Sequence, residues 1–173
     1  MRRTAVIFAT QLILWAVLSE LNHALAHWHI YLWTGALFVT FAAIALPLRS
    51  GLAVTLLGGL LCDAATPVTF GTHMLRVVAS HVALFNIRDR VPRDETMGQV
   101  VIALLVNLGL LLVFSFVEIS GLPSPATAWP RLIFDLVCSQ ILIALVAPWF
   151  FALQAQALSW VEPLSEMYDR RLS

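Results

Sequence analysis

The sequence is poor in charge and has no lysine. Of its 173 residues, only 12% are Asp, Glu, Lys or Arg, whereas about a quarter of a soluble domain is charged. All ten basic residues are arginine, and ten acidic residues balance them to a net charge of zero. A nucleic-acid-binding protein needs a basic surface, so this balance argues against a nucleic-acid partner. The chain also has no long polar block, which leaves no room for a soluble domain of ordinary size.

Cysteine and the common catalytic motifs are scarce as well. The two cysteines, Cys62 and Cys138, lie in apolar segments, and we interpret them as small core residues rather than as a disulfide or metal site. The chain has no His-Glu-x-x-His, no Gly-x-Ser-x-Gly and no Walker lysine. His73 and His81 are not four residues apart, the spacing of a helical zinc pair. We therefore expect no enzyme activity, no cofactor and no metal.

Long apolar runs dominate what is present. Hydrophobic residues make up 60% of the chain, and the mean hydropathy is +0.88. A helix that crosses a bilayer needs about 20 mainly apolar residues. The runs predict an all-α, polytopic membrane protein with six transmembrane helices, the first of them uncleaved. The predicted spans are residues 5–21, 29–46, 51–65, 70–87, 97–119 and 131–153.

The arginines are shared unevenly between the two sides of this predicted bundle. One side has only Arg131, and Arg76 lies inside a predicted helix. Because arginine is enriched in cytoplasmic connections, we expect both termini and the connection 88–95 in the cytoplasm. The arginines on the cytoplasmic side are Arg2, Arg3, Arg49, Arg88, Arg90, Arg93, Arg170 and Arg171.

The chain is expected to form one transmembrane domain, residues 1–153, followed by a short cytoplasmic tail, residues 154–173. The tail is partly amphipathic, since Trp149, Leu153 and Ala157 lie on one helical face. The connection 88–95 is the largest polar feature on the cytoplasmic side. Its arginines, Arg88, Arg90 and Arg93, are therefore the predicted contact site for a partner inside the cell.

Small residues form one face of the third predicted helix. Gly51, Thr55 and Gly59 follow one another at a spacing of four residues, and Asp63 continues the series. Small residues at this spacing let the backbone of another helix come close. We therefore predict a packing ridge that points Asp63 into the bundle.

The fourth predicted helix has a polar face. A short connection makes it the antiparallel neighbour of the third, which places His73 beside Asp63. Arg76 lies about 4.5 Å deeper at 1.5 Å per residue, within reach of Asp63 through its long side chain. His73, Arg76 and Ser80 share a face, and His81 flanks it. We expect Asp63, His73, Arg76 and His81 to be a structural cluster or a partner contact, with a ligand or catalytic site as the other interpretations.

The same region is similar to a known family. The run Gly59-Leu60-Leu61-Cys62-Asp63 is followed by a Pro-x-x-x-Gly turn, Pro67 to Gly71, and by His73-Met74-Leu75. Together with the chain length and six short spans, this resembles the MreD family of bacterial rod shape-determining proteins. Two features depart from the family pattern: Arg76 and His81 are unusually polar for its fourth helix, and the connection 88–95 is well charged.

The resemblance implies a non-enzymatic inner-membrane scaffold of the cell-elongation complex, which maintains rod shape by organising peptidoglycan synthesis. The implied partners are an MreC-like protein, MreB-like filaments, a RodA-type glycosyltransferase and a penicillin-binding transpeptidase, besides the lipid bilayer. The implied fold is similar to the membrane (S) subunits of energy-coupling-factor vitamin transporters. Two other hypotheses stay open: a substrate-binding subunit of such a transporter, and an intramembrane enzyme that uses Asp63, His73 and His81.

Overall fold

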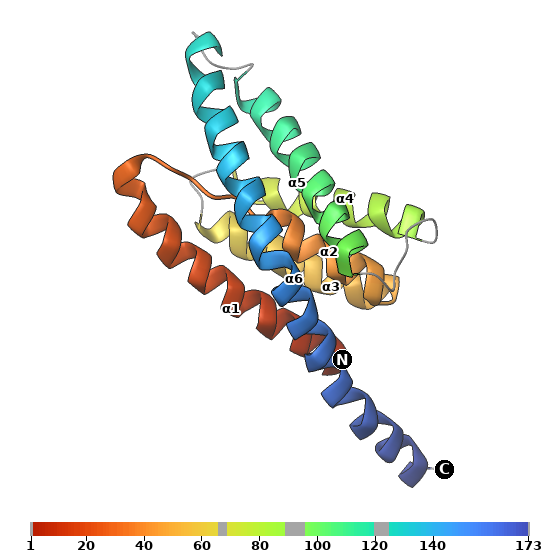
Figure 1. Ribbon diagram of the computed structural model, residues 1–173. Coiled ribbons are helices and arrows are strands. Elements are labelled where there is room, and N and C mark those ends of the chain that lie inside the picture. Colours follow the sequence, from red (N-terminus) through yellow and green to blue (C-terminus); the bar gives the residue numbers. More distant parts are fainter. Residues whose placement is uncertain (1, 66–68, 89–95, 120–124, 173) are drawn as a thin grey trace.

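The computed structural model describes residues 2–65, 69–88, 96–119 and 125–172. Side chains are described over these ranges except for residues 96, 114, 117–119, 125–127 and 162–172. The described chain is all-α, without a strand (Figure 1). Its elements are α1 (Arg2–Leu25), the 3-10 turn η1 (Ala26–Trp28), α2 (Gly35–Ala45), α3 (Leu48–Ala65), α4 (Thr72–Ile87), α5 (Thr96–Ile119) and α6 (Pro125–Leu172).

Helix α2 lies at the centre of the bundle. Every residue from Gly35 to Ile44 is buried, and α3, α4, α5 and α6 all pack against the helix. Helix α1 covers α3 and α6 from outside. A helix that is apolar on all sides is expected to be buried in this way, because it has no polar face to present to solvent.

The helix ends gather at two opposite ends of the bundle. At the first, called the η1 end, residues of α1, α2, α3 and α4 line one cavity, and residues of α5 and α6 line another beside it. At the opposite end, called the Arg88 end, Arg88 after α4 donates a hydrogen bond to the carbonyl of Leu46 after α2. Helix α1 begins at the Arg88 end, and α6 runs past it (Figure 1). Successive helices therefore run in alternating directions.

The predicted starting residue of the second helix is wrong. It was expected from residue 29, but α2 begins at Gly35. His29 has a left-handed backbone, with φ 57°, and the N–H groups of Tyr31 and Trp33 bond to side chains of α6 instead of helical carbonyls. Hydropathy cannot distinguish such an apolar extended segment from a helix.

The sixth predicted span ends near residue 153 and is followed by a partly amphipathic tail, whereas the structure has one continuous helix, α6, that reaches Leu172. It runs through Pro148 without a break, as membrane helices can when neighbouring groups satisfy the backbone. Beyond Pro148, Gln154 is fully buried and donates to the hydroxyl of Thr10 on α1, 3.3 Å away. The beginning of the predicted tail is thus packed against the first helix.

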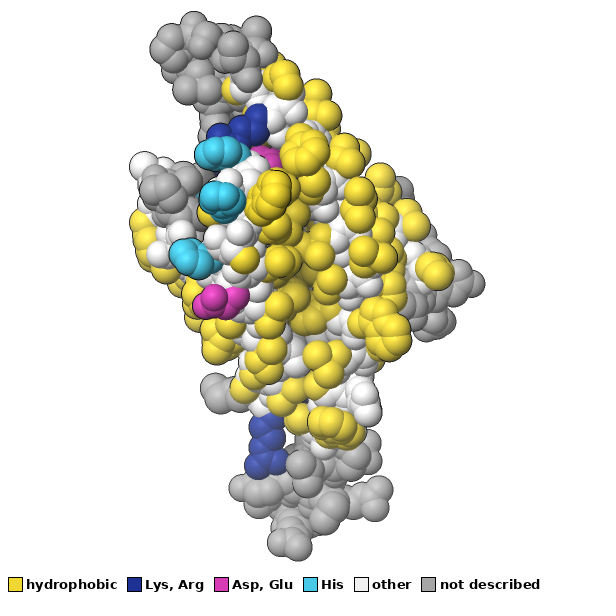
Figure 2. Space-filling view, turned by 60° about the vertical axis from the view of Figure 1, so that its left-hand side comes forward, with side chains coloured by type: hydrophobic (Ala, Val, Ile, Leu, Met, Phe, Trp, Pro, Cys, Tyr) yellow, Lys and Arg dark blue, Asp and Glu magenta, His cyan; other side chains and the backbone are white. Residues whose placement is uncertain are grey.

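The described surface is that of a membrane protein. Figure 2 shows a broad band of hydrophobic side chains, with basic side chains toward its two ends and histidine and acidic side chains along its left-hand side. Large apolar side chains such as Trp149, Phe116 and Leu145 are at least 66% exposed. In the described ranges, three helices are long and apolar enough to cross a bilayer: Arg2–Trp28, Leu48–Ala65 and Ala128–Val161. Gly35–Ala45 and Met97–Val113 are apolar but shorter.

Candidate functional site

Helices α3 and α4 meet along the four residues that share one face of α3. A Cβ added at Gly51 would lie 2.6 Å from the ring of His81, and one at Gly59 would lie 2.6 Å from the Cα of Met74. Between these two glycines, the hydroxyl of Thr55 bonds to Nδ1 of His81 over 2.9 Å. The structure therefore places the ridge directly under α4, where a side chain at either glycine would push the helices apart.

Asp63 ends this seam and holds the first turn of α4. Its carboxylate accepts hydrogen bonds from the backbone N–H groups of Gly71 (3.0 Å), His73 (2.8 Å) and Met74 (3.1 Å). Nδ1 of His73 is also 3.1 Å from Oδ1. The first N–H groups of a helix have no partner within it, and the helix dipole favours a negative charge there. Asp63 thus acts as an N-cap supplied by the preceding helix.

Gly71 makes this arrangement possible. It precedes α4 with φ 95°, a left-handed conformation that glycine adopts without steric cost. The turn directs the N–H of Gly71 back toward Asp63. Asp63 and Gly71, which end the two halves of the sequence motif, are therefore in contact with one another.

The predicted polar cluster is divided among three places. Asp63 and His73 form one pair at the η1 end. His81 lies two helical turns farther along, fully buried and bonded to Thr55. The partner of Asp63 is His73 and not Arg76, the alternative that side-chain reach had allowed. The intramembrane-enzyme hypothesis requires Asp63, His73 and His81 to form one site. In the structure they do not.

Arg76 lies on another face of α4. The residues that α4 buries are His73, Val77, His81 and Leu84, so the expected grouping of His73 with Arg76 and Ser80 is not the one the fold uses. Arg76 is half-buried. It lines an apolar groove of about 390 Å³ between α4 and α5, together with Ser80 and Gly109. The packing of α4 against α3 determines which residues face which neighbour, because it uses contacts about every fourth residue of α4.

Arg88, one of the three predicted partner-contact arginines, is engaged within the chain. Its guanidinium carbon lies 3.7 Å from the centre of the Phe85 ring, a cation–π contact. It also donates to the carbonyl of Leu46, 3.1 Å away. Arg88 thereby ties the end of α4 to the connection between α2 and α3. Arg90 and Arg93 lie outside the described residues.

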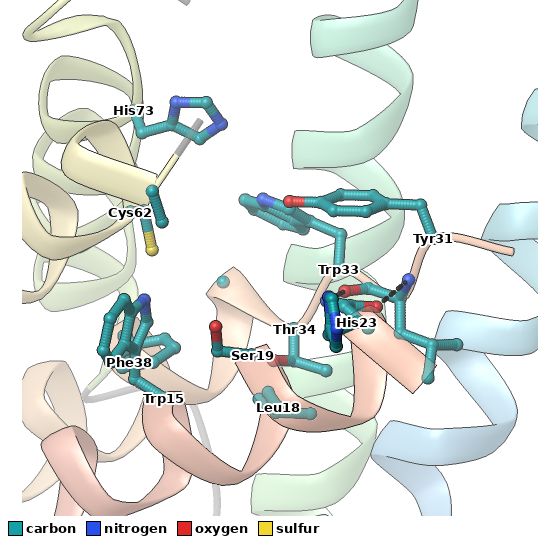
Figure 3. A pocket seen from close by; sticks show the side chains of 14 residues that line it. Trp15, Leu18, Ser19, His23, Tyr31, Trp33, Thr34, Phe38, Cys62 and His73 are labelled. Carbon is teal, nitrogen blue, oxygen red and sulfur yellow. Dashed lines mark hydrogen bonds between the residues drawn. The ribbon is translucent and has the colours of Figure 1, made fainter. Parts of the chain in front are cut away.

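A cavity of about 320 Å³ opens at the η1 end, and we call it the aromatic cavity. Four aromatic side chains line it: Trp15, Tyr31, Trp33 and Phe38. Figure 3 shows the rings of Tyr31 and Trp33 on one side of the space, and His73 and Cys62 on the other. The remaining lining comes from Leu18, Ser19, Asn22, His23, Leu32, Thr34, Gly35 and Ala65.

The extended segment 29–34, called the strap, carries the aromatic wall of this cavity. Side chains of α1 and α6 hold its backbone. The N–H of Tyr31 donates to Asp135 (3.1 Å), and the N–H of Trp33 donates to Ser139 (3.0 Å). Asn22 accepts from the N–H of Leu32 (2.8 Å) and donates to its carbonyl (3.0 Å). These bonds replace the helical ladder that the segment lacks.

Sequence reasoning missed the strap and the residues that hold it. A usable signal was present: Asp135 and Ser139 are four residues apart, so they place two acceptors on one face of an apolar helix. A second cavity of about 110 Å³ lies on the α6 side of the strap, lined by Tyr31, Trp33, His73 and Asp135 among others. Tyr31, Trp33 and His73 line both cavities and therefore form the partition between them.

The described part of the chain holds no group of three or more His, Cys, Asp or Glu side chains that could bind a metal ion. What the arrangement offers instead is helix packing along the α3–α4 seam and a lined cavity at the η1 end. No family model, no curated protein and no solved structure matches this chain.

Proposed function

We propose that this protein is a non-enzymatic scaffold of the bacterial inner membrane, related to the MreD family and acting in the cell-elongation complex. The observation that carries the proposal is the contact between Asp63 and Gly71. Asp63 is the last residue of the first half of the motif on which the family resemblance rests, and Gly71 is the last residue of the second half. Asp63 caps the helix that Gly71 precedes, which gives both ends of the motif a role in holding α4 against α3. The motif residues serve packing and capping here, as a scaffold requires.

The proposed topology is six crossings with both termini in the cytoplasm. The alternating direction of the helices supports this arrangement. Helix α2 is the difficult case, since its 11 residues extend only about 16 Å, roughly half of the apolar core of a bilayer. The strap supplies the rest of that crossing. Irregular backbone at membrane depth is tolerated when its polar groups are satisfied within the protein. Asp135, Asn22 and Ser139 accept hydrogen bonds from three successive N–H groups of the strap, those of residues 31–33.

Depletion tests the scaffold role. In a rod-shaped bacterium that depends on this gene, loss of the protein should turn rods into spheres. Cells in which a cell-division enzyme is inhibited instead serve as a control for indirect effects on shape. An MreC-like protein should co-purify with the chain from detergent-solubilised membranes. Cells that keep their rod shape through several generations without the protein would exclude the scaffold role.

A substrate-binding subunit of a small-molecule transporter is the second candidate. The aromatic cavity favours it, because about 320 Å³ lies within the lower range of ligand pockets. This candidate predicts saturable ligand uptake that depends on the chain. Uptake that is unchanged in cells lacking the protein would exclude it and leave the scaffold proposal untouched.

A further inference from the structure

The wall of the aromatic cavity is held in place by specific contacts. The Trp33 ring lies over Gly35, so closely that a Cβ on Gly35 would be 2.3 Å from its Cη2 and Cζ2 atoms. Any larger residue at position 35 would displace the indole. The backbone that leads into Trp33 is held as well, because the N–H of Leu32 bonds to Asn22 and the N–H of Trp33 bonds to Ser139. The position of this ring is therefore determined by three different helices.

The chemistry of the lining limits what the cavity can hold. Flat aromatic surfaces dominate it, and they favour another flat ring through offset or edge-to-face stacking. Among the described lining residues there is no Arg, Lys, Asp or Glu. A ligand with a fixed charge would enter without a counter-charge, at a high cost in desolvation. The polar groups, such as Ser19, Thr34 and His23, suit neutral hydrogen-bonding substituents.

From these observations we propose that the aromatic cavity binds a neutral small molecule built on a flat aromatic ring, which stacks on Trp33. The volume of about 320 Å³ suits a ligand of one or two rings. Gly35 sets the width of the site by admitting the indole, and the strap positions it. The inference does not depend on the scaffold role, whereas the transporter candidate depends on it.

Cys62 provides a built-in reporter for the test. It lines the cavity, and Figure 3 shows it across the space from Trp33. Cys138 does not belong to the described lining. It is partly buried like Cys62, which makes it the matched control. The full chain in lipid nanodiscs is treated with N-ethylmaleimide, and mass spectrometry gives the alkylation rate at each cysteine. The probes are indole, the saturated alcohol cyclohexanol and the flat anion benzenesulfonate.

Indole should slow the alkylation of Cys62 at least fivefold at saturation, with half of the effect at or below about 1 mM. Cyclohexanol and benzenesulfonate should require at least about tenfold higher concentrations. Trp33→Leu and Gly35→Ala should each raise the half-saturating concentration of indole several-fold, since one removes the ring and the other moves it. A thermal unfolding curve checks that both variants fold.

Equal slowing at Cys62 and Cys138 would mean that indole only partitions into the lipid, and it would overturn the proposal. So would equal effects of indole and cyclohexanol. If Cys62 reacts too slowly to follow, Ala65→Cys in a Cys62→Ser background reports from a more exposed position of the same lining, and absent protection there refutes the proposal. Failure in these tests together with shape loss on depletion would remove this inference and leave the scaffold role standing.

Discussion

Replacing Asp63 tests the capping role that organises the α3–α4 seam. Asp63→Ala removes the acceptor for three backbone N–H groups and for the His73 ring. Interhelical hydrogen bonds in a membrane protein average about 0.6 kcal/mol each, so four of them amount to about 2.4 kcal/mol. The loss of a helix N-cap by itself costs about 0.5–2 kcal/mol. We expect Asp63→Ala to lower the free energy of unfolding by about 2–3 kcal/mol.

Asp63→Asn is the finer perturbation. An amide keeps one acceptor oxygen but turns an N–H₂ group toward donors that need an acceptor. We expect about half of the loss seen with Asp63→Ala, about 1–1.5 kcal/mol. The matched control is Glu20→Gln, the same acid-to-amide change at an exposed position of α1, which should stay within about 0.5 kcal/mol of the parent protein.

Reversible unfolding in mixed micelles with a rising fraction of SDS gives these free energies. Hydrogen exchange locates the effect, because the amides of Gly71, His73 and Met74 should exchange at least about tenfold faster in Asp63→Asn. Stability of Asp63→Ala equal to that of Glu20→Gln would refute the capping argument. Uniformly faster exchange across all helices would show global destabilisation, not the loss of a cap.

Three other predictions follow from the same structure. Gly59→Ala should cost about 1–3 kcal/mol in unfolding free energy, because its Cβ would collide with the backbone of α4. Gly109→Ala should cost under about 0.5 kcal/mol, since its Cβ would meet nothing within 4 Å; equal losses would contradict the packing argument. Asp135→Ala should loosen the strap by removing the acceptor of the Tyr31 N–H, which would appear as faster exchange of that amide and not of α3 amides. A fluorescent protein that matures only in the cytoplasm should be bright when fused to the C-terminus, and a dark fusion at normal abundance would overturn the proposed orientation.

The composition of the chain was sufficient to predict an all-α membrane protein, and the structure confirms the helical class and the apolar surface. The third, fourth and fifth predicted segments lie within three residues of α3, α4 and α5 at both ends. They are bounded by local signals such as Pro47 before α3 and Gly71 before α4. These signals act between neighbours in the chain, so a sequence can display them.

The strap could not be predicted because its backbone partners are distant. Tyr31 and Asp135 are 104 residues apart, and Trp33 and Ser139 are 106 apart. A mainly apolar run of this length looks helical to a local rule, and only the packing of α6 beside it offers another place for its N–H groups. The aromatic cavity was missed for the same reason, since its lining combines residues of four helices.

The sequence by itself determined which residues of α3 share a face, because the helical repeat puts Gly51, Thr55, Gly59 and Asp63 in one line. The short connection also placed the fourth helix, with His73, beside Asp63, but the sequence did not determine the other contacts of that line. The tertiary structure decided that Asp63 would cap α4, that His81 would bond to Thr55 and that Arg76 would face α5. The physical reason is that helical periodicity orients side chains through local geometry, whereas the partner of a buried polar group depends on which helix comes close enough to satisfy it.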